Sequence, residues 1–163
     1  MSTSQVSTQS AVARRAAEAE LRTLIAKFAS AHLRLIGAMR RSLRKRLPSA
    51  HEVVYEYRDF SVTSFSPTEQ GYEGVLAIRA SADGVRLYFN SGKELPDPAK
   101  LLQGSAKTRF IDMEGPPTLA RPAVARLIDE AIARNKVPFA PAGRGSVVIR
   151  SAAAKKRPRR RPT

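Results

Sequence analysis

A chain of 163 residues, 42% of them hydrophobic, has the length and composition of one folded domain. The absence of cysteine excludes a disulfide framework, a thiolate zinc site, an iron–sulfur cluster and a cysteine nucleophile. Lys and Arg number 29 against 14 Asp and Glu, and the formal net charge is +15. Such an excess of positive charge favours association with polyanions.

The charge is concentrated at the C-terminal end. Ten basic and no acidic residues follow Ala131, which leaves a net charge of about +5 on the preceding part of the chain. No apolar run approaches the roughly 18 residues that a membrane span needs. The Ser/Thr/Gln-rich residues 1–10 have neither the basic nor the apolar region of a secretory signal. We therefore expect a cytoplasmic protein with no membrane partner.

The sequence divides into three parts. Residues 1–11 are predicted to be a flexible arm, and residues 12–135 a single domain. Residues 136–163 form a Pro/Gly/Arg-rich basic tail, in which residues 147–149 have the composition of a short strand.

Residues 12–47 have a helical pattern, because their apolar residues recur mostly at spacings of three and four. One long helix and two shorter helices both fit, since Ser30 could cap a second helix after a break near Ala29. Pro48 ends the pattern, because the residue before a proline is disfavoured in the α region. The apolar positions are Leu21, Leu24, Ile25, Phe28, Leu35, Ile36, Met39, Leu43 and Leu47.

Five predicted strands follow, each rich in β-branched and aromatic residues. Asp83-Gly84 is the strongest hairpin signal, because a type I′ turn needs positive φ at both central positions. The connections are too short for parallel crossovers, so the sheet is expected to be mostly antiparallel. The predicted strands are residues 53–57, 60–65, 75–79, 85–89 and 107–113.

A last helix is predicted from Pro122, since proline is favoured at the first helical position. Two N-terminal helices (or one long helix), a five-stranded antiparallel sheet and a C-terminal helix packed on the same face define an α+β fold.

The sequence shows no catalytic constellation, and we expect a non-enzymatic protein without a cofactor. His32 lies in the apolar stripe of its helix, which predicts a structural role, and His51, after Pro48, is expected to face solvent. Glu52 and Glu56 share one face of a strand, and a solvated sheet edge is the favoured interpretation. No residue is assigned as a metal ligand.

A basic segment of the second helical region has a candidate binding surface. Arg34, Arg41, Arg44 and Lys45 fall on one side of the helix, opposite Met39 and Leu43. An ordinary solvated face and a docking stripe for phosphates or an acidic protein both remain open. The tail adds Lys155, Lys156, Arg157, Arg159, Arg160 and Arg161, which are typical either of a polyanion-binding patch or of a solubilising end.

Three segments carry a resemblance to a known family: LRLIGAMRRSLRKRLPSAHEVVYEY from Leu33, FNSGKELPDPAKLLQGSAKTRFIDME from Phe89, and RPAVARLIDEAIARN from Arg121. They resemble the YdhG-like family of small bacterial domains of unknown function, which is distantly frataxin-like in fold. The resemblance implies a helical N-terminus, an antiparallel sheet and a C-terminal helix.

Three hypotheses about function follow. The leading one is a binding or accessory domain that uses the basic helix face and the tail to bind nucleic acid or an acidic protein. The alternative implied by the family resemblance is a frataxin-like iron chaperone, although the acidic ridge of such proteins is not seen here. The third is an enzyme with a pocket between the sheet and the helices.

Overall fold

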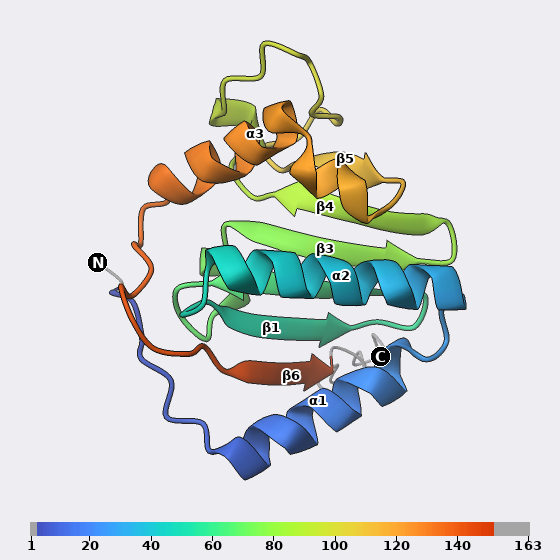
Figure 1. Cartoon of the computed structure of the whole chain (residues 1–163), viewed down its shortest axis with the longest axis vertical. Coiled ribbons are helices and arrows are strands. Elements are labelled where there is room, and N and C mark those ends of the chain that lie inside the picture. Colours follow the sequence, from blue (N-terminus) through green and yellow to red (C-terminus); the bar gives the residue numbers. More distant parts are fainter. Residues whose placement is uncertain (1–2, 152–163) are drawn as a thin grey trace, which may run out of the picture.

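The computed structural model describes residues 3–151 and shows an α+β fold (Figure 1). Within this range lie three α-helices and a six-stranded sheet. The helices are α1 (Ala11–Ile25), α2 (Ser30–Arg46) and α3 (Pro122–Ala133). The strands are β1 (His51–Glu56), β2 (Phe60–Ser66), β3 (Leu76–Ser81), β4 (Gly84–Phe89), β5 (Arg109–Met113) and β6 (Val147–Ser151). Three short 3₁₀ turns connect them: η1 (Gly71–Glu73), η2 (Gly92–Glu94) and η3 (Pro116–Ala120).

The helical region is broken into two helices. Ser10 caps α1, because its hydroxyl oxygen accepts a hydrogen bond from the backbone N–H of Ala13 at 3.1 Å. The chain leaves the helix after Ile25 and enters α2 at Ser30, which resolves the choice between one helix and two. The prediction that α3 begins at Pro122 is confirmed.

The sheet has the strand order β5-β4-β3-β2-β1-β6 and is mixed. Strands β1 to β5 are joined antiparallel, as the short connections predict, but β6 pairs parallel to β1. The prediction of a five-stranded, mostly antiparallel sheet therefore differs in this detail, because the short strand suggested at residues 147–149 joins the sheet as its sixth strand. The long connection through α3 allows β6 to enter beside β1 in the parallel direction. The fold thus continues past Asn135 as far as β6.

The hairpin between β3 and β4 lies where Asp83-Gly84 predicted one, but its turn is placed differently. Ser81 pairs with Gly84, so the two central residues are Ala82 and Asp83, and neither has a positive φ. Gly84 alone adopts the left-handed region, at φ +145°. The turn is therefore not of type I′. The positive φ belongs to Gly84, the residue that follows the two central positions.

Residues 3–10, expected as a flexible arm, make specific hydrogen bonds with the sheet. The side-chain amide of Gln9 donates to the carbonyl oxygen of Val147 at 2.8 Å and accepts from its N–H at 2.9 Å. The backbone N–H of Gln5 donates to the carbonyl oxygen of Pro67 at 2.9 Å. The N-terminal segment therefore contacts the start of β6 and the end of β2, and α1 follows beside β6 (Figure 1).

The core lies between one face of the sheet and the two helices that cover it, α2 and α3 (Figure 1). From α2, Met39 and Leu43 are fully buried, and Ile128 contributes in the same way from α3. On the sheet, Phe65 and Leu87 face them. The helix α1 lies outside this layer, at the β6 edge, so the helices do not all share one face.

Gly145, just before β6, lies so close to the backbone of Ala50 that a side chain does not fit there. A Cβ there would overlap the carbonyl oxygen of Ala50. Gly145→Ala is therefore expected to lower the free energy of unfolding by about 1–3 kcal/mol, since backbone must move. Gly37→Ala, inside α2, is the matched control and is expected to raise it by up to about 1 kcal/mol. Urea denaturation measures both, and equal effects of the two substitutions would contradict the close approach at Gly145.

Candidate functional site

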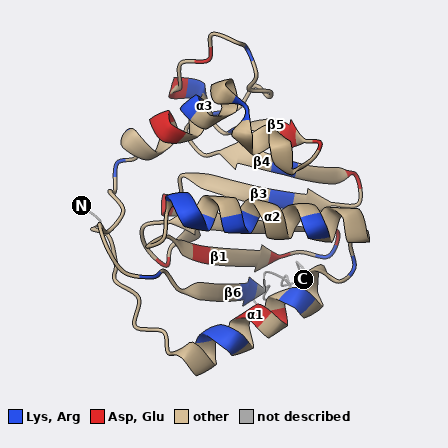
Figure 2. Cartoon of the chain, in the orientation of Figure 1, with Lys and Arg blue, Asp and Glu red and all other residues tan. Residues whose placement is uncertain are grey.

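Basic residues recur along α2 (Figure 2). By their partners they divide into two sets, apart from Arg46, which pairs with Asp129 of α3 at 2.9 Å. Arg40 and Arg44 turn toward α1 and β1. The Nε of Arg40 donates to Glu52 at 2.7 Å, and its terminal nitrogens donate to both carboxylate oxygens of Glu18, at 2.8 and 3.0 Å. Arg44 donates to the second oxygen of Glu52 at 2.8 Å and reaches Glu18 at 3.4 Å. Three elements, α1, α2 and β1, are thereby joined by one ionic network.

Glu52 lies at the centre of this network and is only 2% exposed. The interpretation of Glu52 and Glu56 as a solvated sheet edge was therefore wrong. Both residues point to the same face, as the alternation predicts, but that face is the one on which the helices pack. Glu56 is likewise paired, because it accepts a hydrogen bond from Lys27 at 2.8 Å.

The network shifts the pKa values of Glu18 and Arg40. The hydrogen bonds from Arg40, helped by its charge and that of Arg44, lower the pKa of Glu18 against the opposing effect of burial. Burial alone would lower the pKa of Arg40, but the hydrogen bonds and charges of Glu18 and Glu52 outweigh it and raise that pKa. Glu18 and Arg40 are therefore both charged at neutral pH.

The second set of α2 cations faces solvent. Arg34, Arg41 and Lys45 are exposed, and none of them has a carboxylate partner within residues 3–151. Their spacings of seven and four place them on one side of the helix. We call these three residues the α2 stripe. Arg44, which the sequence grouped with them, belongs to the buried network instead. The tail residues Lys155, Lys156, Arg157, Arg159, Arg160 and Arg161 lie outside the described part of the chain.

The two histidines have different surroundings. His51, expected to face solvent, is fully buried. Its Nδ1 accepts from the backbone N–H of Ser146 at 3.1 Å, and its Nε2 lies 2.8 Å from the carbonyl oxygen of Gln5. These partners require the tautomer with the proton on Nε2. His51 therefore ties the N-terminal segment and the approach to β6 to the sheet, which is a structural role. His32 is partly exposed, and its Nδ1 has no hydrogen-bond partner in this structure.

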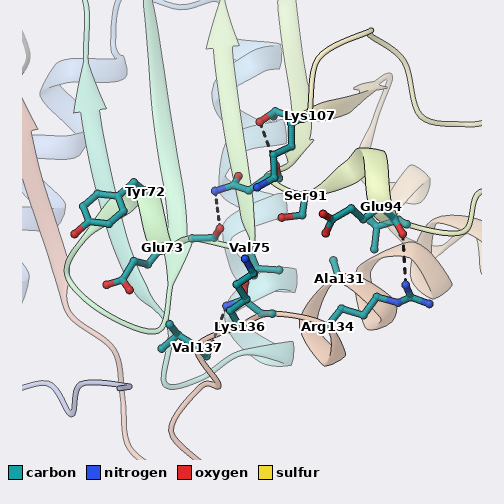
Figure 3. Close-up of a pocket in the computed structure, with 15 residues that line it drawn as sticks. Tyr72, Glu73, Val75, Ser91, Glu94, Lys107, Ala131, Arg134, Lys136 and Val137 are labelled. Carbon is teal, nitrogen blue, oxygen red and sulfur yellow. Dashed lines mark hydrogen bonds between the residues drawn. The ribbon is translucent and has the colours of Figure 1, made fainter. Parts of the chain in front are cut away.

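A hollow of about 870 Å³ opens at one end of the sheet, between η1, η2 and the end of α3 (Figure 3). Tyr72 and Glu73 stand on one side of it, and Glu94 and Arg134 on the other. The guanidinium of Arg134 is held by Glu130 at 2.8 Å and by the carbonyl oxygen of Glu94 at 3.4 Å. Its lining comes from distant parts of the sequence, and no motif in the sequence predicted it.

Among the described residues, no hydroxyl that lines this hollow is paired with a general base. Glu73 accepts a hydrogen bond from the Thr68 hydroxyl at 2.8 Å, and the hydroxyl of Thr108 donates to a backbone oxygen. No lining hydroxyl has a histidine or carboxylate as its hydrogen-bond partner among the described residues. The same residues contain no group of three or more His, Asp or Glu that could hold a metal ion. Iron carriage stays a hypothesis that rests on the family resemblance.

No family model, curated protein or solved structure matches this chain, so membership of the YdhG-like family stays a hypothesis based on the sequence resemblance. Across the described range, no helix combines the length and the apolar character that crossing a bilayer requires.

The buried network generates a prediction about stability. Glu52→Ala removes the buried carboxylate between Arg40 and Arg44 and leaves both arginines with Glu18 as their remaining carboxylate partner. The free energy of unfolding is expected to fall by about 3–5 kcal/mol. Glu20→Ala, which removes an exposed carboxylate of α1, is the control and is expected to change it by less than about 0.5 kcal/mol. Urea denaturation followed by circular dichroism measures both, and a small effect of Glu52→Ala would contradict the network.

A second prediction concerns pH. Because the folded protein holds the pKa of Glu18 below its ordinary value of 4.5, its ionisation stabilises the fold above that value and less as the pH falls through the lowered pKa. Glu18→Gln is therefore expected to be less stable than the parent at neutral pH, and the difference to shrink on acidification. Denaturation curves from neutral pH downward test this. A difference that is constant with pH would contradict it.

Proposed function

We propose that this protein is a non-enzymatic accessory domain that binds a polyanion through the α2 stripe and the basic tail. The observation that carries the proposal is the division of the α2 cations. The carboxylates beside the helix, Glu18 and Glu52, are occupied by Arg40 and Arg44. The stripe residues therefore keep their charge available for an external anion.

The overall charge supports the same function. Residues 3–151 contain 23 basic and 14 acidic side chains, and the last twelve residues add six more basic ones. Exposed carboxylates are scattered over the surface, but none pairs with the stripe. Binding of phosphates by Lys and Arg releases counterions, so the affinity should fall steeply as salt is added. A duplex nucleic acid presents such phosphates at regular intervals and is the probe of choice.

The test is a fluorescence anisotropy titration of a labelled DNA duplex at several salt concentrations. Replacing Arg34, Arg41 and Lys45 together by glutamine is expected to weaken binding at low salt by about tenfold or more. The slope of log affinity against log salt should fall by roughly two to three, because each phosphate contact contributes about 0.9. Truncation after Ala154 is expected to lower the slope further.

A matched control distinguishes binding at the α2 stripe from a general effect of the protein's net positive charge. Replacing Arg22, Lys93 and Lys100 by glutamine removes the same number of positive charges, three, from exposed positions outside α2. This variant is expected to bind nearly as the parent does. If both triple variants lose affinity equally, the α2 stripe is not a binding surface, and if the parent does not bind at low salt, the proposal fails.

A further inference from the structure

The second face of the sheet carries a surface that the proposed function does not use. The helices α2 and α3 cover the other face (Figure 1), and no α-helix of the described residues packs on this one. The 3₁₀ turn η1 lies over Tyr55 and Ser64, so this face is partly covered and Val53 and Ser64 are buried. Two adjacent rows of paired residues cross it. The first row is Arg150, Tyr55, Val62, Arg79, Arg86 and Asp112, and the second is Val148, Val53, Ser64, Ala77, Tyr88 and Phe110. Tyr57, just after β1, and Phe60, at the start of β2, lie on the same face by the alternation of the strands. We call this surface, with these two residues, the open face.

Aromatic side chains on the open face are stacked in pairs. The rings of Tyr57 and Phe60 lie 4.4 Å apart at an interplanar angle of 14°. At the other side of the sheet, the rings of Tyr88 and Phe110 lie 5.3 Å apart at 36°. All four side chains are partly exposed. Solvent-facing strands commonly carry polar residues, so a set of rings on this face calls for an explanation.

Arginines lie against the same rings. The guanidinium carbon of Arg79 is 4.5 Å from the centre of the Phe60 ring, and that of Arg86 is 4.2 Å from the centre of the Phe110 ring. Asp112 pairs with Arg86 at 2.9 Å, whereas Arg79 has no carboxylate partner in the described range. The face therefore alternates flat π surfaces with cations that are held in place by stacking.

A shallow hollow of about 280 Å³ lies on the open face beside η1. Tyr55, Tyr57 and Tyr72 contribute to its lining, over Val62 and Ala77. Tyr72 is 80% exposed, although it is one of the largest side chains in the protein. Its position leaves room for a flat group between tyrosine rings.

We propose that the open face binds single-stranded nucleic acid by stacking unpaired bases on its aromatic rings, with the arginines contacting phosphates. Stacking on aromatic side chains within a positively charged groove is how proteins bind single strands without strong sequence preference. A duplex buries its base faces in its own stack and can offer this surface phosphates alone. The site is distinct from the α2 stripe, which lies beyond the opposite face of the sheet.

The dimensions suit a strand of several nucleotides. Phe60 is on β2 and Phe110 on β5, so three strand spacings, roughly 14 Å, separate them across the sheet. Single-strand sites on other β-sheet domains extend over about 4–16 nucleotides. Charge complementarity also favours this occupant, since Arg79, Arg86 and Arg150 stand in one row and Asp112 is the one carboxylate of that row.

The protein supplies its own reporter for this site. It contains no tryptophan, and its four tyrosines, Tyr55, Tyr57, Tyr72 and Tyr88, all lie on the open face or at its border. Binding of an unlabelled oligothymidine of about twelve nucleotides, within the usual range of site sizes, is expected to quench tyrosine fluorescence. An abasic strand with the same number of phosphates is expected to bind at least tenfold more weakly and to leave the fluorescence unchanged.

The variant to compare is Phe60→Leu with Phe110→Leu, which keeps apolar volume but removes two ring faces. Its affinity for oligothymidine is expected to fall by about tenfold or more, with binding of the duplex unchanged. Phe139→Leu, at a partly buried ring that packs against the core on the other side, is the matched control. Thermal unfolding by circular dichroism checks that each variant is folded. If the double leucine variant does not fold, Arg79→Gln tests the proposed phosphate contact in its place.

The outcomes separate the two surfaces. Oligothymidine binding that survives loss of the α2 stripe but is weakened by the leucine substitutions supports the proposal. Equal affinity for the abasic strand, unchanged affinity in the folded leucine variant, or binding without tyrosine quenching overturns it, and each of these leaves the polyanion function of α2 standing. Loss of duplex binding in the stripe variant bears on the proposed function and leaves the open face unaffected.

Discussion

Burial of one carboxylate, that of Glu52, is the constraint on which the arrangement of this protein depends. A charge taken out of water is costly unless it is paired and hydrogen-bonded, and Glu52 obtains both from Arg40 and Arg44 on the helix above it. The same arginines reach Glu18 on α1. The rotation of α2 about its axis is thereby fixed, because only one orientation brings these two arginines over β1 while Met39 and Leu43 enter the core. That orientation decides which cations remain on the surface.

The pairing also explains why a protein with so much positive charge shows distinct surfaces. Carboxylates are used where the helices meet the sheet, as in the contacts of Glu52 with Arg40 and of Glu56 with Lys27. Exposed cations on α2 are left without partners, and on the far side of the sheet Arg79 rests on an aromatic ring. The two surfaces differ in character, because one offers charge alone and the other offers charge with flat apolar area. They are therefore expected to favour different forms of an anionic polymer.

Much of the fold was predictable from the sequence because hydrophobic spacing reports which residues share a face. It placed the N-terminal helical region, the C-terminal helix and the first five strands close to their observed bounds, and it put Glu52 and Glu56 on one side of β1. It left open whether the N-terminal region was one helix or two. Spacing does not reveal which side of a strand another element will cover, and for this reason Glu52 was assigned to solvent. His51 was misjudged in the same way, since the contacts that bury it come from Gln5 and Ser146, far away in the sequence. The parallel strand β6 was underestimated because its pairing depends on a long connection.

The aromatic residues of the open face had a signal in the sequence, an alternation of aromatic residues and arginines along neighbouring strands. This signal can be interpreted only once the register of the strands is known.

The two edge strands of the sheet, β6 and β5, bear on whether the protein associates with itself. A free outer strand exposes N–H and C=O groups that can recruit a strand from another molecule. On one side, the side chain of Gln9 fills both the donor and the acceptor of Val147, as a neighbouring strand would. On the other, the backbone of Gln103 does the same for Phe110 of β5, at 2.8 and 3.1 Å. One glutamine at each edge thus occupies a donor and an acceptor that a strand from another molecule could use, which disfavours edge-to-edge pairing beside a face that carries partly exposed rings.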